Sequence, residues 1–158
     1  MNIRGLRKPG IFEYGIFMTT SQPQTQGIRM KPELAKPGRP EIIKNILVVD
    51  DTMGVLKATK RLLSRLGIEI TLIDPDLDIR GQVLQMAADA KYDLVIMDGQ
   101  MPGILGHQLT REIREKGYNG YIVANSSDLN EQDKIMAAGA DINNSFKIIT
   151  QLTALFAT

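Results

Sequence analysis

The sequence of 158 residues contains no cysteine and no tryptophan, and it contains one histidine. Without cysteine there can be no disulfide, thiolate metal site or cysteine nucleophile, and the composition fits a cytoplasmic protein. The single histidine, His107, argues against a zinc site built from protein ligands alone. Its position after Gly106, where a helix is expected to begin, predicts a solvated surface residue. No apolar run reaches the roughly 20 residues of a membrane span, so we expect no membrane contact.

An excess of charge of one sign is also missing. The chain has 19 Lys and Arg against 18 Asp and Glu, which offers no electrostatic reason to expect nucleic acid as a partner. The first 44 residues nevertheless hold eight Lys and Arg against three Glu, and five of the seven prolines precede residue 41. This composition predicts a flexible, basic, proline-rich leader over residues 1–44, extended as a linker over 19–41. A short strand at 11–18 is the alternative for its start, and a solvated tether is favoured over contact with an acidic partner.

From Asn45 onward, β-branched runs alternate with amphipathic segments. Strands are predicted where the runs NILVV, IEITLI, DLVIM, YIVAN and DINNSF occur. A helix is predicted after each strand, and the fourth helix is expected to have Asn130 as its N-cap, with Asp128 as the alternative cap. Five β–α units with short, right-handed connections predict a doubly wound α/β fold of the flavodoxin-like type. We expect one domain over residues 45–158 with strand order 2-1-3-4-5, in which the alternating run IEITLI is an edge strand.

Acidic residues follow two strands that this order makes neighbours. Asp50 and Asp51 come directly after the first strand, and Asp98 comes directly after the third. Ligands of open parallel sheets bind beyond the carboxyl ends of the strands, so the three carboxylates should share one pocket. Their mutual repulsion and desolvation are tolerable if a hard divalent cation lies among them. The sequence therefore predicts a Mg²⁺ site formed by these acids and a backbone carbonyl near Gln100.

Four stretches of the chain carry a resemblance to a known family. In order they are ILVVDD, VIMDGQMPG, IVANSSD and AAGADINNSFK. Together they resemble the receiver domain of two-component response regulators over residues 45–158. The resemblance implies that Asp98 accepts a phosphoryl group from a histidine kinase or a histidine phosphotransfer protein, with Asp50 and Asp51 holding Mg²⁺. It also implies that Ser126 binds a phosphoryl oxygen and that Lys147 pairs with Asp98 or its phosphate.

The sequence departs from the family pattern near its C-terminal end. Lys147 comes one residue later than the family's spacing after Gly139, and Ile148 stands where proline is usual. The position of the family's switch aromatic falls on Asn143 or Asn144, with Phe146 as a candidate substitute. We therefore hypothesise that the domain relays phosphoryl groups without the family's usual rearrangement of one face.

Three other functions compete with a phosphoacceptor receiver, which would be no enzyme beyond its own phosphorylation and dephosphorylation. A phosphatase of the haloacid-dehalogenase type also forms an aspartyl phosphate, but it places D-x-D after its first strand, whereas Asp50 and Asp51 are adjacent. A pseudo-receiver would use the fold only as a scaffold. A flavin or nucleotide module is disfavoured because DDTMGV is no glycine-rich phosphate loop. We expect a monomer or weak dimer that is either a stand-alone regulator or the receiver of a hybrid histidine kinase, and the basic leader favours the second.

Overall fold

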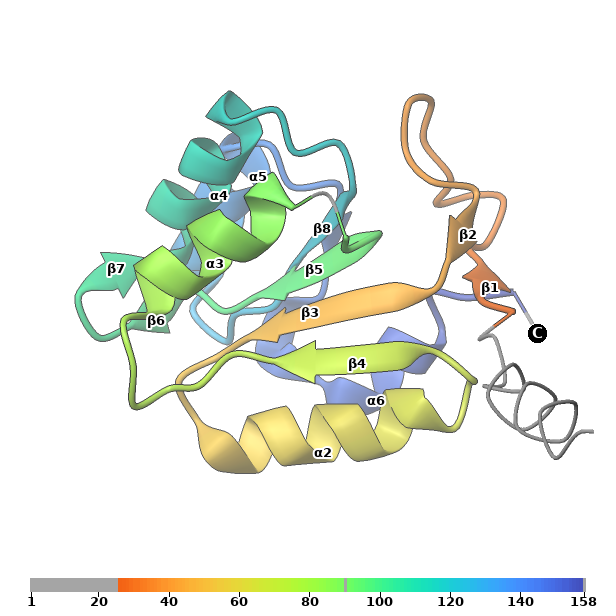
Figure 1. The fold of residues 1–158 in the computed structure, drawn as a ribbon, viewed down its shortest axis with the longest axis horizontal. Coiled ribbons are helices and arrows are strands. Elements are labelled where there is room, and N and C mark those ends of the chain that lie inside the picture. Colours follow the sequence, from red (N-terminus) through yellow and green to blue (C-terminus); the bar gives the residue numbers. More distant parts are fainter. Residues whose placement is uncertain (1–25, 90, 158) are drawn as a thin grey trace, which may run out of the picture.

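A parallel sheet of five strands forms the centre of the computed structural model, which describes residues 26–89 and 91–157 (Figure 1). Its spatial order is β4-β3-β5-β8-β9, which is the predicted order 2-1-3-4-5. The strands, in the order of the chain, are β3 (Asn45–Val49), β4 (Glu69–Leu72), β5 (Leu94–Met97), β8 (Tyr121–Ala124) and β9 (Ile142–Asn143). The prediction of a doubly wound, flavodoxin-like sheet is thus confirmed.

Helices cover both faces of this sheet. In the view of Figure 1, some helices lie below it and the others lie above it. Those below are α2 (Met53–Ser64) and α6 (Ile149–Thr153); those above are α3 (Ile79–Ala88), α4 (Gly106–Glu115) and α5 (Leu129–Ala137). Within residues 26–89 and 91–157, none of the helices combines the length and the apolar character needed to cross a membrane.

Two hydrophobic clusters separated by the sheet form the core. Alternate residues of the central strands face opposite clusters: Ile46 and Val48 pack with the α2–α6 side, while Leu47 and Val49 pack with the α3–α4 side. All four side chains are buried, as expected for a parallel strand covered on both faces. The edge strand β4 is less buried: Glu69 is exposed, Ile70 is buried, and the last two residues are partly exposed. The continuous apolar runs of the central strands therefore reflect burial on both sides.

Short elements complete the rim at the carboxyl ends of the strands. A small antiparallel pair, β6 (Gln100–Met101) with β7 (Ile104–Leu105), follows β5, and a 3₁₀ turn, η1 (Ser145–Lys147), follows β9. Helix α5 begins two residues earlier than predicted. Asp128 is its N-cap, because its Oδ1 accepts hydrogen bonds from the backbone N–H groups of Asn130 and Glu131. The prediction of Asn130 as the cap is therefore wrong, and the alternative, Asp128, is confirmed.

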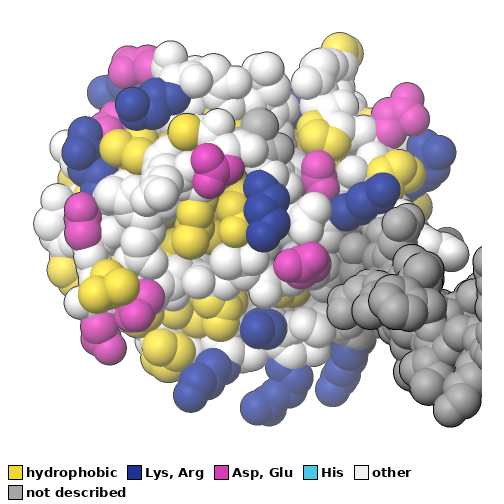
Figure 2. Space-filling model, viewed as in Figure 1, with side chains coloured by type: hydrophobic (Ala, Val, Ile, Leu, Met, Phe, Trp, Pro, Cys, Tyr) yellow, Lys and Arg dark blue, Asp and Glu magenta, His cyan; other side chains and the backbone are white. Residues whose placement is uncertain are grey.

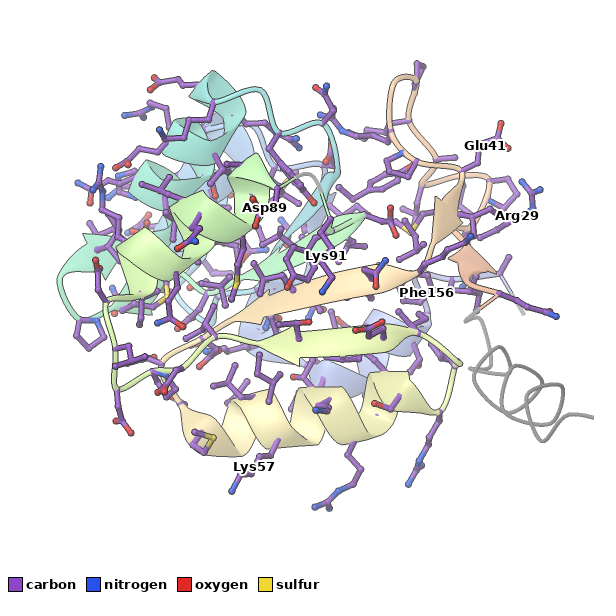
Figure 3. The ribbon with its side chains drawn as sticks, in the orientation of Figure 1. Arg29, Glu41, Lys57, Asp89, Lys91 and Phe156 are labelled. Carbon is purple, nitrogen blue, oxygen red and sulfur yellow. The ribbon has the colours of Figure 1, made fainter. Side chains whose placement is uncertain are left out.

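The leader packs on the domain over its described part, residues 26–44, so the prediction of an extended linker is wrong for residues 26–41. Strand β1 (Ile28–Arg29) pairs with β2 (Ile42–Ile43), and Met30 enters the core beside α6 with 5% of its surface exposed. Met30 forms a β-bridge with Phe156, which Figure 3 places beside β1. The predicted strand at 11–18 and the linker residues 19–25 lie outside the described residues.

The buried acid Asp141 connects the same segment to β8 and α4. The carboxylate of Asp141 lies 3.1 Å from Arg39 Nη2 and 2.8 Å from Arg114 Nη2, and it accepts the backbone N–H of Ile122. The backbone N–H of Lys36 also donates to the hydroxyl of Tyr121. Prolines stop this segment from forming a helix, but they do not prevent such side-chain anchors, which explains how a proline-rich stretch can be ordered.

Replacing Met30 with alanine tests this attachment. Met30 belongs to the leader and is buried in the core cluster that includes Leu152 of α6. We therefore expect Met30→Ala to lower the free energy of unfolding by about 2–5 kcal/mol, the range for truncated core methionines. Met53→Ala is the matched control, since Met53 is 42% exposed and should change stability by less than about 0.5 kcal/mol. Urea denaturation measures both. Equal effects of the two substitutions would show that the leader does not contribute to the folded unit.

Candidate functional site

The three predicted carboxylates meet at the carboxyl edge of the sheet. Asp50 directly follows β3 and Asp98 directly follows β5, and these adjacent strands end level with each other, with Val49 opposite Met97. One carboxylate oxygen from each of Asp50, Asp51 and Asp98 lies within 4.8 Å of the others. Asp50 and Asp98 are buried, at 1% and 5% exposed, whereas Asp51 is partly exposed. The topology thus brings together the acids that the sequence placed 47 or 48 residues apart.

Lys147 lies against two of these acids. Its Nζ is 2.6 Å from Asp50 Oδ2 and 2.9 Å from Asp98 Oδ1. It reaches them from a loop in which Phe146 and Lys147 both have left-handed backbones, with φ of 64° and 56°. Non-glycine residues in this region are strained, and such strain concentrates at functional sites. Phe146 itself is 64% exposed, so it does not pack into the domain as a substitute for the switch aromatic.

The electrostatics of the cluster favour a proton on Asp98 at mildly acidic pH. Burial raises the pKa of Asp98 to about 6 and the Asp50 charge adds to the rise, while hydrogen bonds from Lys147 and Gly99 oppose it. For Lys147, burial works to lower the pKa, but the two acids outweigh it and the pKa is raised. Above neutral pH the site therefore holds an ionised Asp98 beside a charged Lys147.

The donor set of the cluster fits a hard divalent cation. Three carboxylates face one ammonium group, which leaves an excess of two negative charges near Asp98. The buried Asp50 Oδ2 accepts no directed hydrogen bond from any residue in the described ranges, and its contact with Lys147 is an ion pair. Asp50 Oδ1 is held by the backbone N–H of Thr52 at 2.8 Å. Oxygen-only ligands of this kind suit Mg²⁺, and they disfavour metals that prefer sulfur or imidazole.

Ser126 lies on the other side of Asp98, after the end of β8. It is 3% exposed, and its hydroxyl oxygen accepts the backbone N–H of Asp128 at 3.2 Å. The loop after Asp98 approaches it so closely that a Cβ on Gly99 would lie 2.4 Å from Ser126 Oγ. A Cβ on Gly106 would likewise lie 2.0 Å from the carbonyl oxygen of Asp98. A side chain at either position would displace its neighbours, because Ser126 packs against Gly99 and the start of α4 packs against the backbone of Asp98.

Gln100 lies two residues after Asp98 with an exposed side chain. Its Nε2 donates to Asp128 Oδ2 at 3.1 Å, so this side chain connects β6 with the N-cap of α5. The predicted use of its backbone carbonyl as a metal ligand stays a prediction.

A buried pair near the site was missed by the sequence reasoning. His107 is not a solvated surface residue, because its side chain is 16% exposed and its Nδ1 contacts Glu131 Oε1. The Glu131 side chain is 4% exposed, and its Cγ would meet a Cβ placed on Gly99. The one available signal was that Glu131 lies four residues before the core residue Ile135, on the same helical face.

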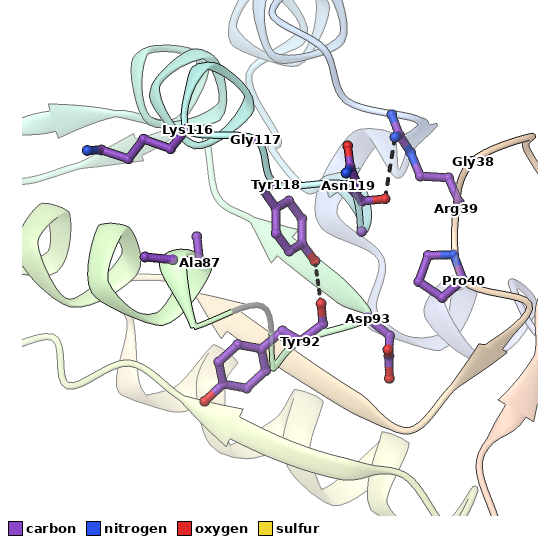
Figure 4. A pocket seen from close by; sticks show the side chains of 12 residues that line it. Gly38, Arg39, Pro40, Ala87, Tyr92, Asp93, Lys116, Gly117, Tyr118 and Asn119 are labelled. Carbon is purple, nitrogen blue, oxygen red and sulfur yellow. Dashed lines mark hydrogen bonds between the residues drawn. The ribbon is translucent and has the colours of Figure 1, made fainter.

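A cavity of about 460 Å³ lies at the opposite, amino-terminal edge of the sheet. Figure 4 shows it between Tyr92, Tyr118 and the Gly38–Pro40 segment, with the Tyr118 hydroxyl bonded to the carbonyl of Tyr92. Its lining includes none of the three clustered acids. Asp98 therefore lies outside this cavity, on the opposite rim of the sheet.

Known proteins share this arrangement at several levels. A family model described as a response regulator receiver domain matches residues 46–147. The two-component response regulator ORR41 of Oryza sativa subsp. japonica is 37% identical over 103 residues, which cover 64% of this chain and 80% of that protein. The virulence sensor protein BvgS of Bordetella pertussis is 30% identical over 118 residues, covering 68% of this chain but only 9% of the sensor. Among solved structures, the receiver domain of the histidine kinase CKI1 from Arabidopsis thaliana, complexed with Mg²⁺ and BeF₃⁻, matches with a TM-score of 0.61 and 26% identity, covering 71% of this chain and 86% of that one.

Proposed function

Because the chain belongs to the response regulator receiver domain family, we propose that its Asp98 accepts a phosphoryl group from a phosphohistidine in a two-component phosphorelay. The observation that carries this proposal is the contact of a buried Asp98 with Lys147 inside a cluster of acids. A buried carboxylate with a raised pKa, a cationic neighbour and further acids is typical of a reactive site. A structural role alone would need none of these groups together.

The hydrogen bonds of Asp98 select the oxygen that reacts. Oδ1 accepts from the backbone N–H of Gly99 and from Lys147 Nζ, whereas Oδ2 accepts no hydrogen bond from any described residue. In the proposed step, Oδ2 forms a bond to phosphorus while the bond from phosphorus to the imidazole nitrogen breaks. The nitrogen keeps the electron pair and takes a proton. Lys147 would neutralise part of the negative charge on the phosphoryl oxygens, and the hydroxyl of Ser126 would donate a hydrogen bond to one of them. Positioning and charge neutralisation dominate this chemistry.

Mg²⁺ is the proposed cofactor of this step. Asp50, Asp51 and Asp98 would hold it by their carboxylates and Gln100 by its backbone carbonyl. When bound, Mg²⁺ supplies positive charge to the phosphoryl oxygens. The chain's own contribution is to hold Asp50 through Thr52 and to balance the remaining negative charge with Lys147.

The proposed partner is a histidine kinase or a histidine phosphotransfer protein. Its histidine must reach Asp98, so its surface would cover the rim on which α2 begins. Lys and Arg side chains gather along the lower edge of the molecule in Figure 2, where α2 lies. Exposed basic residues on this helix are Lys57, Lys60 and Arg61, and Arg65 is its exposed C-cap. We propose that the partner presents an acidic surface there, because complementary charge speeds encounter.

Phosphorylation by a small donor tests the function without the partner. With Mg²⁺ and excess acetyl phosphate, we expect the intact protein to gain the mass of one phosphoryl group, and chelation of Mg²⁺ should prevent the gain. Asp133→Asn, which changes an exposed acid on α5, is the control and should be phosphorylated normally. Sustained hydrolysis of many small phosphate esters would favour a phosphatase instead. Failure to gain any phosphoryl group would favour a scaffold.

A further inference from the structure

Gln132 is a buried glutamine whose side chain uses all its hydrogen-bonding groups. It lies on α5 and is 1% exposed. Its Oε1 accepts the backbone N–H of Ser126 at 2.8 Å. Its Nε2 donates to the carbonyl of Ala124 and to Asn143 Oδ1, both at 2.7 Å. The amide therefore has one orientation only. If it were rotated by half a turn, its NH₂ group would face the N–H of Ser126 and its oxygen would face the carbonyl of Ala124, so neither hydrogen bond could form.

This one side chain connects two segments of the site: the one that carries the Ser126 hydroxyl and the one that leads to the Lys147 ammonium group. On one side it fixes the backbone of Ser126, whose hydroxyl lies beside Gly99. On the other side it holds Asn143, whose Oδ1 also accepts the hydroxyl of Ser145 in the turn that leads to Lys147. No metal ligand takes part in these contacts. Gln132 thus lies behind the site and touches it only through its neighbours.

A second amide contact strengthens the same connection. Asn144 is 3% exposed, and its Nδ2 donates to Asn125 Oδ1 at 2.7 Å and to the carbonyl of Ile148. The ends of β8 and β9 are therefore joined by polar side chains at the positions where the sequence lacks the family's aromatic. Buried polar networks that are fully satisfied favour a single arrangement, because each broken contact leaves an unpaired group.

We propose that Gln132 is a positioning residue that holds the hydroxyl of Ser126 in place for a phosphoryl oxygen; this inference rests on the proposed function of Asp98. Gln132 fixes the backbone of Ser126, and Gly99 packs against the Ser126 side chain. The remaining freedom of Ser126 is then the rotation of its hydroxyl group. The fixed hydroxyl would stabilise a phosphoryl group on Asp98 without first ordering the loop. Loss of the Gln132 amide would leave a buried N–H unpaired and let the Ser126 loop move.

The affinity for beryllofluoride, a phosphoryl analogue, tests this role. In NMR titrations at saturating Mg²⁺, we expect Gln132→Met to bind beryllofluoride about tenfold more weakly than the wild type. Its affinity for Mg²⁺ alone should be unchanged, because the acids on β3 and β5 do not contact Gln132. Gln85→Met is the control, since Gln85 is an exposed glutamine on α3. A purely structural role would lower stability but leave the beryllofluoride affinity of the folded protein intact.

A double-mutant cycle separates action through Ser126 from a general effect. Ser126→Ala should weaken binding to a similar extent, and Gln132→Met should then cause little further loss. Asn143→Ala serves if Gln132→Met does not fold, because Asn143 is exposed and supports only one side of the amide; about threefold weaker binding is expected. Wild-type affinity in the folded variants, or fully additive losses, would overturn the inference. If the wild-type protein itself bound no beryllofluoride, the proposed function would fail instead.

Discussion

We expect Asp98→Asn to abolish phosphoryl acceptance while the domain stays folded. The amide cannot form the acyl phosphate, so labelling by acetyl phosphate and Mg²⁺ should fall by at least about a thousandfold, to the detection limit. The fold should survive because asparagine is nearly isosteric and its Oδ1 can still accept from Gly99 and Lys147. Intact mass measures labelling, and circular dichroism checks the fold.

Replacing the neighbouring acid Asp51 should have a different effect on labelling. Asp51→Asn keeps the nucleophile but removes a proposed metal ligand, so its labelling should persist weakly and require a higher concentration of Mg²⁺. Labelling of Asp98→Asn at the wild-type level would place the acceptor on another residue and contradict the assignment.

Without metal, we expect the ionisation of Asp98 to destabilise the folded protein as the pH rises from 4.5 to 7.5. The pKa of Asp98 is about 6 in the folded protein against an ordinary 3.8, so folding favours the protonated acid. The stabilisation that this provides is fully present below pH 4 and is lost as the pH rises through 6. Linkage predicts a loss of about 2 kcal/mol over this range from Asp98 alone.

Urea denaturation in the presence of a chelator, at both pH values, measures this loss. Asp98→Asn has no titrating group at the position, so its stability should change by about 2 kcal/mol less than that of the wild type. Saturating Mg²⁺ should remove the difference, because a bound cation favours the ionised carboxylate. Identical pH dependence of the two proteins in chelator would mean that the burial of Asp98 has no electrostatic consequence.

The sheet and its acids were predictable because both depend on local patterns. The apolar run Leu94–Met97 identifies a strand buried on both faces, and the turn residues after Asp98 mark where it ends. Once the strand order is inferred, the position of Asp98 beside Asp50 follows from topology alone. Lys147 could be proposed from the resemblance, although its spacing is displaced by one residue.

Contacts between distant segments were not predictable in the same way. Met30 lies in a polar, proline-rich stretch without periodicity, and its partner Phe156 is more than a hundred residues away. His107 and Glu131 meet only because α4 and α5 pack side by side, and neither residue signals a partner in the sequence. Gln132 looked like one polar residue among several in NEQDK. Which of these side chains faces inward depends on where α5 begins, and Asp128 sets this start two residues earlier than the pattern suggested.

A crystal structure of the protein with Mg²⁺ and beryllofluoride would show directly whether Asp98 is the phosphoryl acceptor. We expect a cation bound by Asp50, Asp51 and Asp98, beryllofluoride on Asp98 Oδ2, and Ser126 and Lys147 in contact with its fluorine atoms. Electron density with the three carboxylates pointing apart, no cation between them and no beryllofluoride on Asp98 would contradict this expectation.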